Sequence, residues 1–371
     1  MRVICNGLDL ADAVGKVIKA MSARSINPIL ECIKIKAEAN TLTLTATDLE
    51  LTIEKQINAD VEIEGTLVVP GKFLNDYIKK MTDGQIEFSL SDRKLLTLRY
   101  LDAVGEIRCF NEDEFPQIKE VNNAESFKLQ SCVLKDFINK IVFSVAVDEA
   151  RPILKGCLFD VNGALGLITG VALDGYRLAK CTKPLISSTA SSLTAVVPAR
   201  SLIELHKLLD ESETEVTVYK QRSGIMVSLG GTKVYTRLLD GDYLNYNQIL
   251  PVEFSTEITL SRKHFEIALD RASLISRSDK NNLVKLDVRE NYLTVSSESE
   301  IGKAEEKLSI NMRGKEITLV FNVRYFIEAL RVTDDEFLRI KFTRPESPCV
   351  ITSAEENSEY LYLFLPIRVP G

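Results

Sequence analysis

The chain has 371 residues, of which 45% are hydrophobic and 27% are charged. This composition excludes a disordered or collagen-like chain and fits two or three globular domains of average size. With 46 basic against 53 acidic residues the net charge is -7, which argues against binding nucleic acid over the whole surface. The positions of the charges therefore decide whether nucleic acid remains a candidate partner.

Targeting and membrane signals are weak in this sequence. The opening MRVICNGLDL lacks the apolar run of a signal peptide, and no stretch approaches the roughly 18 apolar residues that cross a bilayer. The seven cysteines include no CxxC pair and are expected to be small buried hydrophobes in a reducing compartment. These features predict a soluble, cytoplasmic protein.

One segment occurs three times along the chain. Its copies are VVPGKFLNDYIKKM, VVPARSLIELHKLL and VFNVRYFIEALRVT, which begin at Val68, Val196 and Val320. Each copy is typical of a β-branched strand that turns into a helix with apolar residues at helical spacing. The sequence therefore predicts a threefold internal repeat.

A second predicted helix repeats in step with the first. Leu10, Leu134 and Phe265 hold the same place in its three copies, and PILECIKI from Pro28 matches PILKGCLF from Pro152. The third copy has NLVKLDVR at that place and lacks the proline. Each repeat therefore contains at least two helices in a fixed order.

Two-residue alternation marks strands between these helices, as in TLTLTAT, VTVYK and KVYTRLL. Each repeat is expected to hold two helices and about eight short strands. Polar and turn-forming residues collect after the Phe-Pro and Leu-Pro pairs that end the first two repeats. They predict three domains, over residues 1–122, 123–253 and 254–371.

Residues for bond chemistry are scarce. The only histidines, His206 and His264, lie on predicted helices, which leaves little for a zinc site or a Ser-His-Asp relay. There is no phosphate-binding GxxxxGK[ST] loop, and the Gly230-Gly231 pair is typical of a hairpin turn. We expect no catalytic residues, no metal and no cofactor, so a scaffold is favoured over an enzyme.

Basic residues, in contrast, recur with the repeat. The strand-to-helix segments have a base at one position and a second base seven residues later, at Lys72 and Lys79, Arg200 and Lys207, and Arg324 and Arg331. On the other predicted helix the equivalent bases are Lys16, Lys140 and Arg271. The alternative is a solvated face with ion pairs, because an acid follows each first base by four residues.

Predicted helices over 8–21, 71–81, 133–146, 199–209, 262–275 and 323–331 sum to a charge of +6, which leaves -13 for the rest of the chain. A whole-chain average conceals this separation of sign. It allows DNA to bind at one part of an acidic protein.

Several strings resemble a known family, the DNA polymerase III beta subunit or sliding clamp of bacteria. They are PILECIKI with TATDLEL in the first repeat, RPILKGCLF with ALDGYRLAK and VVPARSLIEL in the second, and the C-terminal LPIRV. Their order, the three repeats and the length together make the resemblance specific over essentially the whole chain.

The resemblance implies an α+β fold with three clamp domains, each with two helices packed on two antiparallel four-stranded sheets. It also implies a ring-shaped head-to-tail homodimer whose helices line a hole around double-stranded DNA, as in a processivity factor for DNA replication. Contacts to phosphates would then be independent of base sequence. The implied DNA-binding residues are Arg24, Lys72, Lys79, Lys80, Arg200, Lys207, Arg324 and Arg331.

The family also has a hydrophobic pocket for short linear peptides, taken from the replicative polymerase, the clamp loader complex, and repair and translesion polymerases. Leu173 and Tyr176 depart from the Thr and His that are common there, which leaves the peptide preference open. The implied pocket residues are Arg151, Leu154, Leu173, Asp174, Gly175, Tyr176, Arg177, Leu178, Pro251, Leu365, Pro366, Ile367 and Arg368.

For the dimer interface, the resemblance implies Leu274 and Ile275 on one subunit against Ile107 and Phe110 on the other. Taken without the family, Leu274 and Ile275 are expected to pack beneath their own helix. The alternative function is a repeat scaffold that binds proteins and no DNA. A third class, an enzyme that acts on nucleic acid, would show metal-dependent turnover.

Overall fold

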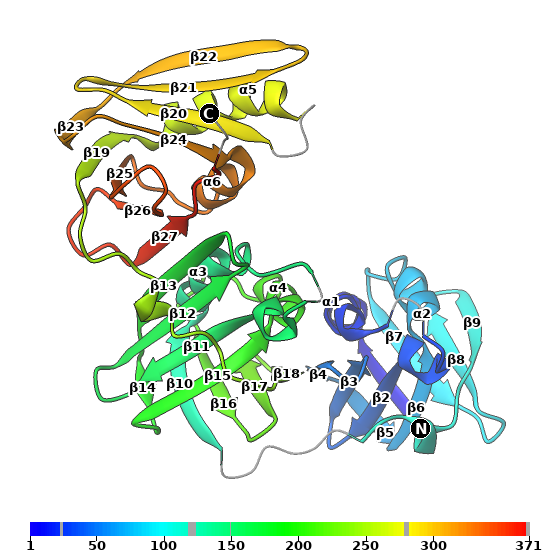
Figure 1. Cartoon of the computed structure of the whole chain (residues 1–371). Helices are drawn as coiled ribbons and strands as arrows, with labels where there is room; N and C mark the ends of the chain where they lie inside the picture. The colour runs from blue at the N-terminus through cyan, green and yellow to red at the C-terminus, as the bar shows by residue number, and fades with distance from the viewer. Residues whose placement is uncertain (23–24, 118–123, 149, 278–281, 369–371) are drawn as a thin grey trace. The chain divides into compact units, whose positions relative to one another are not determined.

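The computed structural model describes residues 1–22, 25–117, 124–148, 150–277 and 282–368. The chain forms two compact units, coloured in chain order in Figure 1. The first unit comprises residues 1–132, 186–190 and 200–238, and the second comprises 133–185, 191–199 and 239–371. The predicted middle domain thus contributes to both units, and the predicted domain boundaries stay a prediction.

The α-helices described in the first unit are α1 (Gly7–Val17), α2 (Gly71–Ile78) and α4 (Ala199–His206). Short 3-10 helices are η1 (Ile18–Ala20), η2 (Pro28–Glu31) and η3 (Glu112–Glu114). Its strands are β1 (Arg2–Asn6), β2 (Cys32–Glu38), β3 (Thr41–Thr47), β4 (Leu51–Asn58), β5 (Asp60–Ile63), β6 (Gly65–Pro70), β7 (Gln85–Leu90), β8 (Leu95–Tyr100), β9 (Ala103–Arg108), β10 (Glu125–Gln130), β14 (Ser187–Ser188), β16 (Glu215–Lys220), β17 (Gly224–Leu229) and β18 (Thr232–Arg237).

The second unit contains α5 (Arg262–Ser276), α6 (Val323–Leu330) and nearly all of α3 (Ser131–Val142). Its 3-10 helices are η4 (Pro152–Lys155) and η5 (Tyr246–Gln248). Its strands are β11 (Gly156–Asn162), β12 (Leu167–Leu173), β13 (Arg177–Pro184), β15 (Ser192–Pro198), β19 (Thr256–Ser261), β20 (Leu283–Val288), β21 (Tyr292–Ser299), β22 (Gly302–Ser309), β23 (Asn311–Gly314), β24 (Ile317–Asn322), β25 (Phe337–Phe342), β26 (Cys349–Ser353) and β27 (Tyr360–Phe364).

All strand pairs in the four sheets are antiparallel. The first unit has a five-stranded sheet, β5-β1-β7-β8-β9, and a nine-stranded sheet, β14-β10-β16-β17-β18-β4-β3-β2-β6. The second has a nine-stranded sheet, β15-β11-β12-β13-β27-β26-β25-β19-β23, and a four-stranded sheet, β22-β21-β20-β24. Each nine-stranded sheet therefore combines strands from two successive repeats.

The threefold repeat is confirmed by one recurring hydrogen bond. The backbone amides of Phe110, Leu239 and Ile367, each shortly after the last strand of its repeat, donate to the carbonyl oxygens of Val68, Val196 and Val320 at 2.7, 2.9 and 2.7 Å. These three valines begin the repeated segment. The same backbone arrangement therefore recurs where the sequence pattern recurs.

Each helix begins directly after a strand, as the strand-to-helix pattern predicts. Asn6 caps α1 by accepting from the backbone amides of Leu8 and Asp9, and Asn322 caps α6 by accepting from that of Arg324. A side-chain oxygen at this position satisfies amides that have no partner within the helix. The short polar residue at the end of the strand thus sets where the helix starts.

Aromatic and aliphatic side chains fill the space between helices and sheets. In the second unit Phe137 of α3 meets Phe159 of β11 edge to face, with ring centroids 5.2 Å apart. Gly170 of β12 faces the same ring, and a Cβ atom built there would lie only 2.5 Å from it. Only glycine lets α3 approach the sheet this closely.

Other expectations from the sequence can be compared directly with the structure. Gly230 and Gly231 have φ of 48° and 71° and join β17 to β18, which confirms the predicted hairpin turn. The serine-rich segment from Ser187 contains the short strand β14, which pairs with β10. Five of the seven cysteines are buried and two are partly buried. No helix in the described residues is long and apolar enough to span a membrane.

Replacing Gly170 with Ala should destabilise the second unit by about 1–3 kcal/mol, because the added methyl group overlaps Phe137 and Ile141. The matched control is Gly15→Ala in α1, where nothing lies within 4 Å and Ala should stabilise the helix by about 0.5–1 kcal/mol. Urea unfolding of both variants measures the difference. Equal stability of the two variants would contradict the close approach.

Candidate DNA interface and peptide surface

The predicted DNA-binding bases are exposed and lie at the two ends of the second helix of each repeat. Lys72, Arg200 and Arg324 lie in the first turn of α2, α4 and α6. At the other end, Lys79 and Arg331 are C-cap residues, and Lys207 directly follows α4. Lys80 is also exposed, and Arg24 lies outside the described residues.

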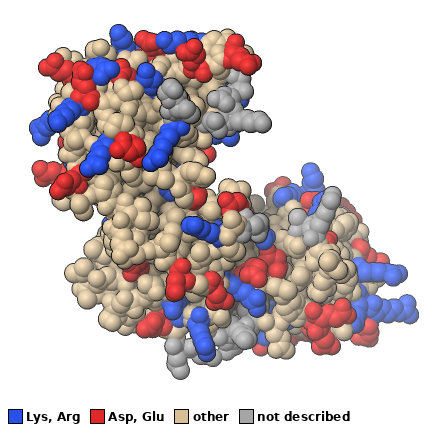
Figure 2. Space-filling model, viewed as in Figure 1, with Lys and Arg blue, Asp and Glu red and all other residues tan. Residues whose placement is uncertain are grey.

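The prediction that the helices carry a large positive charge is wrong for the helices as the structure bounds them. The six α-helices in the described part of the chain contain nine Lys or Arg and eight Asp or Glu, a net charge of +1. Lys79, Lys80, Lys207 and Arg331 lie just beyond the last helical residues, where a cation interacts favourably with the negative end of the helix dipole. Figure 2 accordingly shows basic and acidic side chains interspersed on the visible face.

Two of the predicted bases are already paired within the first unit. The Arg200 guanidinium lies 2.6 Å from Oδ2 of Asp48, and Nζ of Lys207 lies 2.8 Å from the carboxylate of Glu204. The other oxygen of Asp48 accepts from the backbone amides of Glu50 and Leu51 and so shapes the β3–β4 turn. Arg200 therefore also fastens α4 to this turn, while most of its side chain stays exposed.

The bases of the first helices have structural partners. Lys16 pairs with Asp12 at 2.7 Å, and Arg271 pairs with Glu306 at 3.3 Å. Lys140 is only 13% exposed and lies 2.9 Å from Asp136. The three bases at equivalent sequence positions are therefore ion-pair partners, two of them within their own helix and one with an acid on β22.

Asp136 is the centre of a small charged network in the second unit. Its carboxylate binds Lys140 and also Lys183, which pairs in turn with Glu359. Burial disfavours ionisation of Asp136, but hydrogen bonds from the two lysines outweigh it and hold the pKa of Asp136 below its usual value. Burial likewise opposes the charge of Lys183, but hydrogen bonds to Asp136 and Glu359 raise its pKa.

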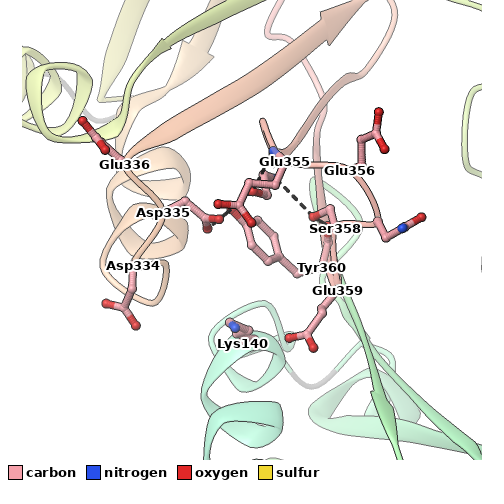
Figure 3. Close-up of a pocket in the computed structure, with 11 residues that line it drawn as sticks. Lys140, Asp334, Asp335, Glu336, Glu355, Glu356, Ser358, Glu359 and Tyr360 are labelled. Carbon is pink, nitrogen blue, oxygen red and sulfur yellow. Dashed lines mark hydrogen bonds between the residues drawn. The ribbon is translucent and has the colours of Figure 1, made fainter.

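Beside this network is a hollow of about 400 Å³, drawn in Figure 3. Lys140 lies at its edge, and Asp335 accepts hydrogen bonds from Ser353 at 2.6 Å and Tyr360 at 2.5 Å. Among the described residues no group of side chains has the geometry of a metal site. The carboxylates that line the hollow are Asp334, Asp335, Glu336, Glu355, Glu356 and Glu359.

The predicted peptide-pocket residues separate into a floor and a rim within the second unit. Leu154, Leu173 and Leu178 are buried in one apolar cluster with Tyr246 and Leu363. At the rim, Arg151, Gly175 and Arg368 are exposed and Tyr176 is 63% exposed. Pro251, Leu365, Pro366 and Ile367 are partly buried.

The rim is held together by the backbone. The amide of Leu365 donates to the carbonyl oxygen of Tyr176 at 2.8 Å, which joins the C-terminal segment to the β12–β13 turn. Sequence reasoning missed the exposed apolar side chains that this unit also carries, at Val147, Leu244 and Val252. Their only sequence signal is that they lie in polar segments that flank predicted pocket residues.

Arg177 differs from the other pocket residues because it is buried, with 8% exposure, and its donors are in use. Its Nε donates to Asp174 at 3.0 Å, its Nη2 donates to the carbonyl oxygen of Phe143 at 2.7 Å, and its Nη1 donates to Glu328. The guanidinium also lies 4.6 Å from the ring centre of Tyr325. In this structure Arg177 is a link between β13, α3 and α6.

The predicted dimer residues are unequally exposed. Leu274 on α5 is 57% exposed and Phe110 is 38% exposed, whereas Ile275 is partly buried and Ile107 on β9 is buried. Further exposed apolar side chains are those of Val104 on β9, the strand of Ile107, and of Ile301, which precedes β22.

Three copies of one strand-rich repeat, joined strand to strand and carrying bases at the ends of their second helices, define a repeat protein of the clamp class. Family models of the DNA polymerase III beta subunit match residues 1–119 (N-terminal domain), 128–245 (central domain) and 247–368 (C-terminal domain). The chain therefore belongs to the DNA polymerase III beta subunit family.

Individual relatives support this family assignment. The beta sliding clamp of Halalkalibacterium halodurans is 32% identical over 369 residues, with 96% of each chain covered. That of Bacillus subtilis is 30% identical over 370 residues, with 97% of each covered. The solved DNA polymerase sliding clamp from Bacillus subtilis matches the whole of both chains with a TM-score of 0.96 at 29% identity. A solved putative DNA polymerase III beta subunit from Eubacterium rectale matches both whole chains with a TM-score of 0.94 at 28% identity.

The Asp136 network predicts a specific pH dependence of stability. Because its folded-state pKa lies below the reference value of 3.8, Asp136 stabilises the fold above that pH and loses this contribution as the pH falls through its folded-state pKa. Asp136→Asn should lower the free energy of unfolding at neutral pH by roughly 1–3 kcal/mol, and this difference should shrink below about pH 4.

Urea titrations of both proteins across the acidic range measure this difference. Asp12→Asn is the matched control, because Asp12 makes the same helical pair with Lys16 but is more exposed. That variant should change stability by less than about 1 kcal/mol at any pH. A pH-independent effect of Asp136→Asn would show that the carboxylate charge is unimportant there.

Proposed function

We propose that this chain is a processivity factor, a ring that encircles double-stranded DNA and tethers a replicative polymerase to it. One observation carries the proposal. The two junctions between repeats join the sheets edge to edge, and β9 and β22 are the corresponding edges that stay open among the described residues. A second copy that supplied the missing partner strands would close a ring of six repeats.

The two junctions inside the chain share one register. β4 of the first repeat pairs antiparallel with β18 of the second, with Thr52 opposite Tyr235. β13 of the second repeat pairs in the same way with β27 of the third, with Leu178 opposite Leu363. Counting along the strand ladders from Val68 and from Val196 places Thr52 and Leu178 at the same register position in their repeats. The chain therefore repeats the junction as well as the domain.

The same register can be carried to β9 and β22. Counting along the strand ladders from Val320 places Lys303 of β22 at the position of Thr52 and Leu178. Counting back from Phe110 places Glu106 of β9 at the position of Tyr235 and Leu363. Glu106 of one copy should therefore lie opposite Lys303 of another, with Gly105 opposite Ala304.

The side chains of the two edges suit this pairing. Glu106 and Lys303 have opposite charges, and Gly105 and Ala304 are small. Val104 on β9 and Leu274 on α5 are 60% and 57% exposed, so both edges have apolar area to bury. Unpaired strand edges of this kind are a liability in a monomer, which supports a homodimer.

The hole of such a ring would be lined by the second helices and their terminal bases. Exposed lysines and arginines attract phosphates whatever the base sequence, and topological closure keeps the ring on the duplex. Contacts can then stay weak enough to permit sliding. No step requires a catalytic group, so the proposed role is that of a non-catalytic accessory subunit in the cytoplasm, with no cofactor.

The apolar floor and exposed rim in the second unit would receive short linear peptides. A few buried apolar anchors surrounded by polar contacts are sufficient for peptide docking. The proteins proposed to carry such peptides are the replicative polymerase, the clamp loader complex, and repair and translesion polymerases. The exposed Tyr176 at the rim is the residue most able to set the peptide preference.

A repeat scaffold that binds only proteins remains the second candidate. It shares the fold but requires neither the recurring bases at the helix ends nor a closed ring. An enzyme acting on nucleic acid is disfavoured by the scarcity of residues for bond chemistry in the sequence.

Retention on DNA separates these functions. The loaded protein should stay on a nicked circular duplex and leave when the circle is cut to a linear form, which gel filtration of radiolabelled protein can follow. Charge reversal at Lys79, Lys207 and Arg331 together should weaken loading or retention, because three phosphate-attracting charges are inverted.

The fold of that variant should survive, since each reversal at a helix end costs only about 0.3–1 kcal/mol. Thermal melting provides the check. A wild-type protein that stays monomeric at micromolar concentration and is never retained on the circle would refute the clamp function. Loss of folding in the triple variant would assign those bases a structural role.

The proposed register can be tested by a charge swap. Glu106→Lys should weaken the dimer by about 0.5–2 kcal/mol, because two like-charged pairs are created in each ring. Adding Lys303→Glu should restore the dimer. Sedimentation equilibrium measures the dissociation constant of each variant.

The control for the swap combines Glu106→Lys with Lys285→Glu, an exposed base on the inner strand β20 of the same sheet. This pair should not restore the dimer. Equal restoration by Lys303→Glu and Lys285→Glu would show that net charge matters and the register does not.

A further inference from the structure

The second helix of each repeat carries an acid between its two bases. The triplets are Lys72, Asp76 and Lys79 in the first repeat, Arg200, Glu204 and Lys207 in the second, and Arg324, Glu328 and Arg331 in the third. Residues spaced by four and then three lie on one helical face, with neighbouring Cβ atoms roughly 5–6 Å apart. A carboxylate at this distance is within the Debye length of about 8 Å at physiological salt, so it opposes the attraction of phosphates.

The structure neutralises this acid differently in α4 and α6. In α4, Glu204 is paired with Lys207, one of the two bases of its own triplet. In α6, Glu328 is paired instead with Arg177, which lies at the start of β13 in the preceding repeat. No carboxylate among the described residues lies within ion-pair distance of Arg324 or Arg331. Both bases of the α6 triplet therefore stay available.

The side chain of Arg177 is held in a fixed position by several contacts. The guanidinium is positioned by Asp174 and by the carbonyl oxygen of Phe143, and it stacks near the rings of Phe143 and Tyr325. Asp174 itself is fixed because its other oxygen accepts from the backbone amides of Tyr176 and Arg177. One buried cation thus lies between two carboxylates, and only Glu328 belongs to the proposed DNA-facing helix.

The corresponding turn in the first repeat shows that this is not a general feature of the fold. Asp48 shapes the β3–β4 turn as Asp174 shapes the β12–β13 turn, but its free oxygen binds Arg200, a base of the α4 triplet. The residue at the place of Arg177 in that turn is Leu51. At the second junction, Arg177 replaces the triplet base as partner of the aspartate and also neutralises the triplet acid.

We propose that Arg177 is a positioning residue for DNA, which neutralises Glu328 and so keeps Arg324 and Arg331 free to attract phosphates. This inference rests on the proposed function, and it gives Arg177 a role other than contact with a peptide. Without the guanidinium, the charge of Glu328 would cancel that of one neighbouring arginine, and α6 would lose roughly one phosphate contact per subunit.

The test measures how the affinity for a short fluorescent duplex depends on salt, by anisotropy with the full-length protein. Arg177→Gln removes the charge but keeps a hydrogen-bond donor near Phe143. It should weaken binding and make the log–log salt slope shallower by about 0.9 per subunit engaged. Adding Glu328→Gln should return the slope to the wild-type value, and Arg177→Lys should leave it close to wild type.

The double variant distinguishes charge balance from structure. If Arg177 served only to join β13 to α6, Glu328→Gln would break the same contact and could not rescue Arg177→Gln. Arg289→Gln is the matched control, because Arg289 is also paired with two acids but lies beyond β20, outside the triplets. It should leave the slope unchanged. Thermal melting of every variant checks folding.

If Arg177→Gln fails to fold, Glu328→Gln alone continues the test. Charge balance predicts that this variant binds the duplex at least as tightly as the wild type, and weaker binding would overturn the proposal. A wild-type slope for folded Arg177→Gln, or no rescue in the double variant, would also overturn it. If the wild-type protein itself shows no salt-dependent binding to the duplex, the proposed function fails rather than this inference.

Discussion

Antiparallel backbone pairing at sheet edges is the constraint on which the rest of this structure depends. Each repeat ends two sheets in strands whose N–H and C=O groups need partners, and an open edge invites association. Within the chain the need is met by the next repeat, through β4 with β18 and β13 with β27. The same need at β9 and β22 makes a second copy part of the proposed function.

The junctions also organise the charges. Asp48 and Asp174 use one oxygen to shape the turn after the third strand of their repeat, which leaves the other oxygen facing an arginine. At the first junction that arginine is Arg200, so fastening α4 reduces the charge it offers to phosphate. At the second junction Arg177 takes this place. The aspartate that a turn requires in one repeat thus influences how much positive charge the second helix of the next repeat presents.

The sequence could predict most of the fold, because hydrophobic periodicity repeats three times and each copy supports the others. The helix ends were less predictable. Lys79, Lys207 and Arg331 were assigned to helices, but the regular helix stops before them, since the final turn has no local signal that distinguishes a helical residue from a cap. Together with Lys19 and Lys80, which also lie beyond the α-helices, these three bases account for the difference between the expected charge of +6 and the observed +1.

The contacts of individual site residues are harder to predict from the sequence than the helix ends. The resemblance implies a pocket role for Arg177, but no sequence pattern shows that its donors are taken by Asp174 and by Glu328, which is 151 positions away. Contacts at such separation depend on the junction between repeats and not on local sequence. Lys183, one of the two lysines that bind Asp136, could not be recognised in advance either, because it lies far from Asp136 in the sequence.

The position of the bases at helix C-terminal ends reconciles an acidic chain with a DNA partner. The C-terminal end of a helix carries about half a negative charge, so a base there first offsets the dipole and then contributes what remains to the outside. In the proposed function, Lys79, Lys207 and Arg331 would therefore serve helix stability and phosphate attraction at once. Because retention by a closed ring does not require tight contacts, a small positive excess at three repeated places is enough. The remaining acidic surface then disfavours DNA elsewhere, and a net charge of -7 is compatible with a single place for the duplex.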